Sequence, residues 1–279
     1  MAWAPFLTGR RSAGKSEGMS EIDAWRAYAR TLGFPLPAEA EKDYLQELLL
    51  REIYSRTGNE FVFRGGTAIS KVCKSGRFSD DLDFVLSRES ANAAGAVEAA
   101  INGMKSYFDI SYSREEYRGM IEFSISVYGP LYRASGNPSA KQKISVDLNT
   151  YERPLLPTKA LLVTPIYNDV RPYSVIVESE EELLADKVKA AIERREKHKT
   201  IFARDLYDAW FLIRKYGLKP NLGLVAEKMR LYGIKEFALG DFRNAVEEAK
   251  DYWKEELGRM LVTVPDYETA RQELLQALR

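Results

Sequence analysis

The chain has 279 residues, of which 45% are hydrophobic and 29% charged, values that are typical of a globular protein with a full core. Its 41 basic residues balance 41 acidic ones, so the composition does not indicate a dedicated non-specific nucleic-acid binder, which is usually strongly basic. The lone cysteine, Cys73, excludes an intramolecular disulfide and fits a reducing compartment. The lone histidine, His198, argues against a histidine metal cluster and a Ser-His-Asp triad.

Residues 1–20 are expected to form a flexible lead, and Met19 is an alternative start to Met1. This segment contains basic residues but lacks the apolar core of a secretory signal. No apolar run in the chain approaches the roughly 20 residues that a membrane-spanning helix needs. We therefore expect a cytoplasmic protein that does not contact membranes.

Two helices are expected to open the folded part of the chain. Residues 21–32 show helical spacing of apolar side chains and stop at Gly33, with Pro35 just beyond. Residues 39–56 carry an apolar stripe at i, i+3 and i+4 and end before Gly58. We expect both helices to pack against a sheet.

The stretch from Phe61 to Leu86 carries the strongest functional signal. A short β-rich run meets Gly65-Gly66, and residues 67–74 then have helical character. A glycine pair lets the backbone approach a ligand closely, and a helix start offers free N–H groups to an anion. The pattern predicts a phosphate-binding turn made of Gly65, Gly66 and Thr67.

A second strand, residues 81–86, follows a polar turn. The alternation of a strand places Asp81 and Asp83 on one face, about 7 Å apart. Two carboxylates at that spacing suit divalent cations that carry a triphosphate. An isolated Asp-x-Asp pair is most often a solvated strand edge, but the ordered pattern G-G-T-x(11)-S-x-D-x-D is far more specific.

The middle of the chain is expected to form a helix, a strand, a loop and a second strand, over residues 90–108, 120–128, 129–141 and 143–149. Strict alternation in both strands indicates a sheet with one packed face and one polar face. If the second strand neighbours the strand of Asp81 and Asp83, Asp147 joins them on the polar face. The alternative, an Asp147 that simply faces outward, stays equally open because register cannot be read from a sequence.

The last part of the chain is predicted to be helical. Residues 151–170 form an irregular connection with a short strand, and residues 174–177 form a last β-like piece. Ser179-Glu180-Glu181-Glu182 then matches a capping box. We predict an α+β fold with a mixed sheet, divided into a core domain, residues 21–177, and an all-helical C-terminal domain, residues 178–279.

Charged residues on the first two of these helices are open to two interpretations. Lys187 borders an apolar face, where a lysine is either paired or extends its amino group into solvent. Asp205 and Asp208 lie near the start of a helix, where acidic residues stabilise the helix dipole. The basic run 194–199 is usually a solvated turn and less often a phosphate contact.

Taken together, these segments resemble the AbiEii/AbiGii and MenT-like nucleotidyltransferase toxins, a branch of the DNA polymerase β-like superfamily. The resemblance spans roughly residues 41–216 and depends on the order of four segments. These are RGGTA from Arg64, RFSDDLDF from Arg77, ADKVKAAIERR around Lys187 and RDLYD from Arg204. It implies a polymerase β-like nucleotidyltransferase core.

The resemblance also implies metal-dependent transfer of a nucleoside monophosphate from an NTP to an acceptor hydroxyl. Asp81 and Asp83 would bind Mg²⁺ or Mn²⁺, with Asp147 as a further ligand. Family members modify tRNA 3′ ends, so tRNA is the implied acceptor, and a cognate antitoxin is the implied partner in a type IV-like system.

The same resemblance assigns roles to residues outside the acidic pair. Lys187 would contact the triphosphate or the substrate. Asp205 would be the acting aspartate of its element, with Asp208 as structural support. Arg77 and Ser79 would shape the turn, with Arg77 free to reach phosphate.

Three other functions stay open at this point. A small-molecule nucleotidyltransferase would share the core, and a phosphotransferase would instead move the γ-phosphoryl group to a partner protein. A non-catalytic interaction module could also retain the fold. The residues support the binding of a metal and a nucleotide better than they support tRNA as the acceptor, because few cationic residues besides Arg204 follow the basic run.

Overall fold

The computed structural model describes residues 21–198, 201–233 and 239–278. At the centre of this part lies a seven-stranded mixed sheet with the strand order β3-β4-β5-β2-β1-β7-β6. The strands are β1 Phe61–Arg64, β2 Leu82–Leu86, β3 Asp109–Tyr117, β4 Met120–Tyr128, β5 Gln142–Asn149, β6 Lys159–Val163 and β7 Tyr173–Val177. The β2–β5 and β1–β7 pairs are parallel, and the other neighbours are antiparallel.

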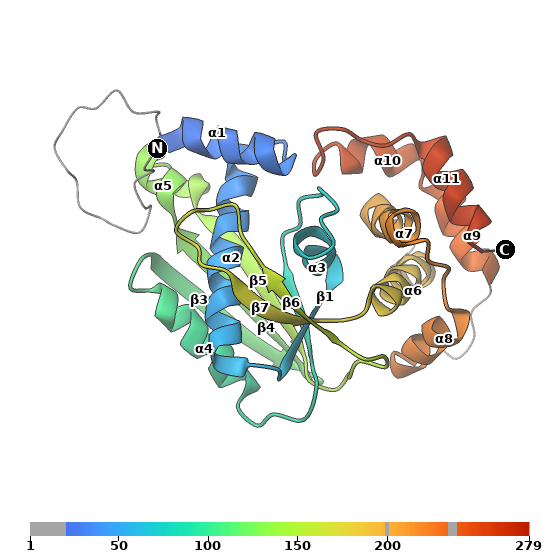
Figure 1. Ribbon diagram of the computed structural model, residues 1–279, viewed down its shortest axis with the longest axis horizontal. Coiled ribbons are helices and arrows are strands. Elements are labelled where there is room, and N and C mark those ends of the chain that lie inside the picture. The colour runs from blue at the N-terminus through green and yellow to red at the C-terminus, as the bar shows by residue number, and fades with distance from the viewer. Residues whose placement is uncertain (1–20, 199–200, 234–238, 279) are drawn as a thin grey trace.

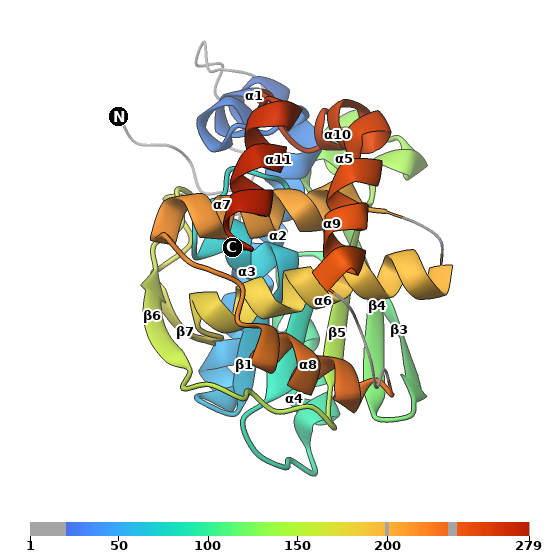
Figure 2. The same ribbon diagram turned by 90° about the vertical axis from the view of Figure 1, so that its right-hand side faces the viewer.

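Helices lie on both sides of the sheet, with α2 and α4 on one side and α3, α6 and α7 on the other (Figure 1). The first group is α1 Glu21–Leu32, α2 Pro37–Thr57, α4 Ala93–Met104 and the short α5 Pro130–Ser135. The second is α3 Gly65–Lys71, α6 Glu180–His198, α7 Ala203–Tyr216, α8 Leu222–Leu231, α9 Leu239–Glu248, α10 Lys250–Leu257 and α11 Tyr267–Gln276. A view from the helical side shows α6 and α7 crossing in front of the strands (Figure 2). The predicted α+β fold with a mixed sheet is confirmed.

Alternation along β4 and β5 fixes the two faces of the sheet. Phe123, Ile125, Val146 and Leu148 are buried in the main core. Since successive side chains of a strand point to opposite faces, the polar residues between them lie on the other face. That polar face holds the candidate site.

Two stretches differ from the sequence-based expectation. No strand was expected over residues 109–117, where β3 forms, because seven of its nine residues are exposed and show no alternation. The expected loop, residues 129–141, contains α5 and a 3₁₀ turn, Pro138–Ala140. β3 lies at the edge of the sheet, where packing constrains the pattern least, and α5 lies in the connection between β4 and β5.

The capping prediction at Ser179 is half correct. The Ser179 hydroxyl accepts a hydrogen bond from the Glu182 N–H at 3.2 Å, as an N-cap residue does. The Glu182 carboxylate instead accepts from the backbone N–H groups of Leu155 and Leu156, at 2.8 and 3.0 Å. The start of α6 is thereby fixed to the loop that precedes β6.

The division into two domains at residue 177 stays a prediction, and the predicted N-terminal lead and Met19 lie outside the described residues. From β7 onward, the described residues form helices and connections only. Within the described ranges, no helix is both long enough and apolar enough to span a bilayer.

A buried ionic cluster joins the helical half to the sheet. Lys228 of α8 is fully buried, and its Nζ lies 2.9 Å from Asp186 Oδ1 and 3.0 Å from Glu182 Oε1, both on α6. Arg64, at the end of β1, pairs with Asp186 at 2.7 Å and with Glu152 at 2.8 Å. Because an unpaired buried charge is costly, this cluster holds α6 and α8 in one position against β1.

We expect Lys228→Ala to destabilise the protein by about 3–5 kcal/mol, because it leaves buried carboxylates without their cation. Urea unfolding followed by circular dichroism measures the loss. Lys250→Ala is the control, since Lys250 forms only an exposed pair with Glu268 at 3.5 Å and such pairs contribute little. Equal stability of the two variants would contradict the role given to the cluster.

Candidate active site

The structure supplies the strand register that the sequence left open. β2 and β5 are parallel neighbours, and Asp83 lies directly beside Asp147. Both are partly buried, whereas Asp81, one residue before β2, is exposed. The Ser145 hydroxyl donates to Asp147 Oδ1 at 2.9 Å. Asp83 and Asp147 therefore form an acidic pair, and Asp81 lies at the solvent side of this pair.

A ready-made metal centre of three carboxylates is not present. Among the described residues, no group of three or more Asp, Glu, His or Cys side chains lies close enough to hold a metal ion. Mg²⁺, however, is commonly bound by one or two carboxylates, with waters and substrate phosphates completing its octahedral shell. The acidic pair supplies that number of carboxylates, and Asp81 lies at its solvent side.

The electrostatics of the acidic pair favour a bound cation. Burial, reinforced by the charge of Asp83, raises the pKa of Asp147 to about 6. Although the Asp81 side chain reaches solvent, partial desolvation by the surrounding protein and the charge of Asp83 raise its pKa. Burial also raises the pKa of Asp83 itself, and nearby cations offset only part of this effect. Burial is the largest cause in all three cases, and a cation bound beside these carboxylates would stabilise their ionised form.

The diglycine turn is shaped by the side chains around it. Gly65 has a φ of 74°, and a Cβ there would lie 2.2 Å from Asp83 Oδ2. A Cβ on Gly66 would lie 2.3 Å from Arg77 Nη2 and 2.9 Å from Ser79 Oγ. The sequence predicted that the glycines leave room for a ligand close to the backbone. In the structure, the side chains of Asp83, Arg77 and Ser79 lie in that room.

Two side chains expected to bind phosphate are already engaged. The buried guanidinium of Arg77 forms two hydrogen bonds with Asp208, Nε to Oδ1 at 2.9 Å and Nη2 to Oδ2 at 2.8 Å. The Thr67 hydroxyl donates to the backbone oxygen of Asp81. The expectation that Arg77 is free to reach phosphate is therefore wrong for this structure, and both side chains hold the turn that presents Asp81.

Lys187 and Asp205 lie on the helical side of the site. The buried Lys187 Nζ is 2.9 Å from Asp208 Oδ2 and 3.2 Å from Asp205 Oδ1. Burial lowers the pKa of Lys187, but Asp208 and Asp205 more than offset this and raise it above its ordinary value. Lys187 also lowers the pKa of Asp83, so a permanent cation faces the acidic pair from α6.

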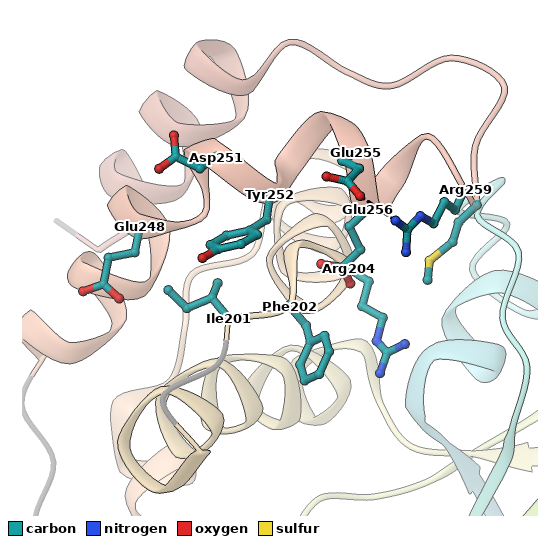
Figure 3. A pocket seen from close by; sticks show the side chains of 10 residues that line it. Ile201, Phe202, Arg204, Glu248, Asp251, Tyr252, Glu255, Glu256 and Arg259 are labelled. Carbon is teal, nitrogen blue, oxygen red and sulfur yellow. Dashed lines mark hydrogen bonds and ion pairs between the residues drawn. The ribbon is translucent and has the colours of Figure 1, made fainter.

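A cavity of about 690 Å³ adjoins this helical side, between the start of α7 and α10 (Figure 3). The Phe202 ring in its wall is contacted by the guanidinium groups of Arg194 and Arg204, 4.7 and 4.6 Å from the ring centre. In Figure 3 the Arg204 side chain extends away from α10 beside Phe202. Arg204 lowers the pKa of Asp81, so its charge acts on the carboxylates. No signal in the sequence pointed to Phe202, and Arg194 was expected only as part of the basic run 194–199.

A second cavity, of about 710 Å³, lies over β3, β4 and β5 and reaches Asp81. Its walls carry serine and lysine side chains from alternate strand positions. The carboxylates therefore lie between two cavities of different character.

This arrangement of sheet, acidic pair and helical half has the fold of a nucleotidyltransferase. JHP933 from Helicobacter pylori superimposes with a TM-score of 0.55 and 19% identity, over 86% of this chain and 89% of that one. A protein from H. pylori described as a candidate nucleotidyltransferase gives a TM-score of 0.53 and 20% identity, over 85% and 93%. At such identities the likeness establishes the fold alone.

The family follows from the sequence. The model of the family described as nucleotidyl transferase AbiEii toxin, type IV TA system, matches residues 47–277. The chain belongs to this family of nucleotidyltransferase toxins, which confirms the resemblance seen in its motifs. The match includes α8 to α11, beyond the motifs themselves. No curated protein matches the sequence.

We expect Gly65→Ala to destabilise the fold by about 1–3 kcal/mol more than Gly136→Ala, the range typical of overpacked sites. Both glycines have positive φ, so the backbone strain is matched, but nothing lies within 4 Å of a Cβ at Gly136. Denaturant unfolding of the two variants isolates the contact with Asp83. Equal losses would mean that Asp83 moves aside without cost.

The ionised side chain of Asp147 is expected to lower the free energy of unfolding at alkaline pH. Its pKa of about 6 in the folded protein lies above the ordinary value, so the stability it contributes is complete at low pH and is lost as the pH rises through 6. In EDTA, Asp147→Asn should therefore be more stable than wild type at pH 8 and equally stable near pH 4. Urea unfolding across this range tests the trend, with exposed Asp109→Asn as a control that should not show it.

Proposed function

We propose that this toxin transfers a nucleoside monophosphate from an NTP to the 3′ end of a tRNA in a metal-dependent reaction. The observation that carries the proposal is the β2–β5 register, which sets Asp83 beside Asp147 at the diglycine turn. The acceptor oxygen attacks the α-phosphorus of the NTP. The bond between the α-phosphorus and the oxygen that bridges to the β-phosphate breaks, and pyrophosphate leaves. The hydroxyl proton passes to a carboxylate of the site or to water.

The acidic residues would hold the metal. Asp81, Asp83 and Asp147 together supply the hard oxygen ligands that Mg²⁺ or Mn²⁺ prefers. Such an ion, when bound, neutralises phosphate charge and lowers the pKa of a coordinated hydroxyl. Burial raises the pKa of each of these carboxylates, and the charge of Asp83 adds to this effect at Asp81 and Asp147, so their need for a counter-charge supports the assignment.

The triphosphate would lie between the diglycine turn and the cations of the helical half. Gly65 and Gly66 present backbone without a Cβ, and Ser79 lies beside them. Lys187 is held in its charged form by two aspartates. Arg204 forms no ion pair with any described residue; its guanidinium lies on the Phe202 ring, from where it would bind a phosphate oxygen.

Asp205 would act through its neighbours. Its carboxylate contacts both Lys187 and Arg194, so it orients two cations that face the acidic pair. Asp208 binds Lys187 and Arg77, which supports the structural role expected for it. Membership of a type IV toxin–antitoxin family implies a cognate antitoxin as a further partner.

The test is transfer of label from each of the four NTPs to total tRNA in the presence of Mg²⁺. We expect label from an α-labelled NTP, and none from a γ-labelled one, in the tRNA. Asp83→Asn should reduce transfer at least about 100-fold, as loss of a metal ligand does. The matched control Asp109→Asn should leave it unchanged.

Other outcomes would assign a different function. Transfer of the γ label to a protein would indicate a phosphotransferase, and α label in a small molecule would indicate a small-molecule nucleotidyltransferase. If Asp81→Ala and Asp83→Ala both retained transfer, the site would be wrongly assigned.

A further inference from the structure

Polar side chains form rows across the three strands at one end of the sheet, on the face that holds the acidic pair. The β3–β4–β5 register aligns two such rows, Ser111-Ser126-Lys143 and Ser113-Ser124-Ser145. Ser145 also donates to Asp147. The second row therefore leads directly to the acidic pair.

The cavity of about 710 Å³ lies over these rows, and Asp81 lines its inner end. Three lysines contribute to its lining, Lys42, Lys141 and Lys143. Lys42 pairs with Asp80. Within the described part of the chain, neither Lys141 nor Lys143 pairs with a carboxylate, so two positive charges face the cavity without an internal partner.

Its chemistry differs from that of the cavity in Figure 3, whose lining includes the carboxylates Glu248, Asp251, Glu255 and Glu256. Serine hydroxyls donate and accept hydrogen bonds, as ribose hydroxyls and phosphate oxygens require. Lysine and serine are also frequent phosphate contacts in nucleic-acid complexes. A sugar–phosphate chain is complementary to this lining, because Lys42 is paired with Asp80 while Lys141 and Lys143 have no carboxylate partner among the described residues.

We propose that this serine–lysine cavity (Ser111, Ser113, Ser124, Ser126, Lys141 and Lys143) binds the ribose–phosphate backbone of the acceptor strand. The strand enters over β3, and its terminal hydroxyl reaches the acidic pair beside Ser145. This assignment rests on the proposed function and adds to it the path of the acceptor. The NTP then occupies the opposite, helical side, next to Lys187 and Arg204.

The test compares two double variants of the full chain that change the net charge equally. Lys141→Glu/Lys143→Glu alters the cavity, and Lys219→Glu/Lys254→Glu alters exposed lysines that line neither cavity. With α-labelled NTP and total tRNA, the cavity variant should raise KM for tRNA at least about 10-fold, corresponding to loss of two phosphate contacts. KM for the NTP should be unchanged, and the control should match wild type for both substrates.

The salt dependence gives an independent readout. Binding of labelled tRNA, measured by filter retention between 50 and 200 mM salt, should show a slope of log K against log salt that is reduced by about 2 in the cavity variant. Thermal unfolding checks that both double variants fold. If the cavity variant does not fold, the single substitution Lys143→Ala replaces it, with an expected slope change of about 1.

Several results would overturn the assignment. These are an unchanged KM for tRNA, an equal rise in the control, or a rise in KM for the NTP alone. A failure of the proposed function can be distinguished from a failure of this assignment, because the wild-type protein itself would then label no tRNA. In that case the filter assay decides: equal tRNA binding by wild type and the cavity variant refutes the cavity as a strand site, and weaker binding by the variant supports it.

Discussion

Asp83 and Asp147 repel each other across a parallel strand pair, and the rest of the site is arranged around that repulsion. Burial keeps both side chains from full hydration and is the main reason that their pKa values are raised; at Asp147 the charge of Asp83 adds to this effect. Lys187 supplies part of the opposing charge from α6, and Gly65 leaves the room in which the Asp83 carboxylate lies. The helical half is therefore an electrostatic part of the site, because Lys187 adds to the positive charge that Arg64 contributes from the end of β1.

Asp208 links the geometry of the two halves. It binds Arg77 of the turn before β2 and Lys187 of α6, and it is completely buried. A displacement of α7 would therefore move the turn that presents Asp81 and the cation that faces Asp83 together. Charge-assisted, two-bond pairing of this kind fixes orientation as well as distance, so the carboxylates and their cations are positioned as one unit.

Local pattern was enough to predict β4, β5 and the polar face that carries Asp147, because each follows from alternation; the helix expected from Thr67 instead begins at Gly65. The register that sets Asp147 beside Asp83 is a long-range property, and alternation cannot supply it. The pairing of Arg77 joins residues 131 positions apart, and no local signal identifies Asp208 as its partner. β3 escaped prediction because an exposed edge strand needs no apolar alternation.

A transfer between two polyanions poses a particular problem for a chain whose basic and acidic residues are equal in number. Zero net charge gives no general attraction for nucleic acid, so the positive charge must be local. In this fold it is divided between two sides of the acidic pair: Lys141 and Lys143 over the sheet, and Lys187 and Arg204 on the helices. In the proposed reaction, the carboxylates between them would keep the two phosphate chains apart until a divalent ion is bound. Under the proposed function, the metal requirement and the separation of NTP from acceptor thus follow from the same placement of charge.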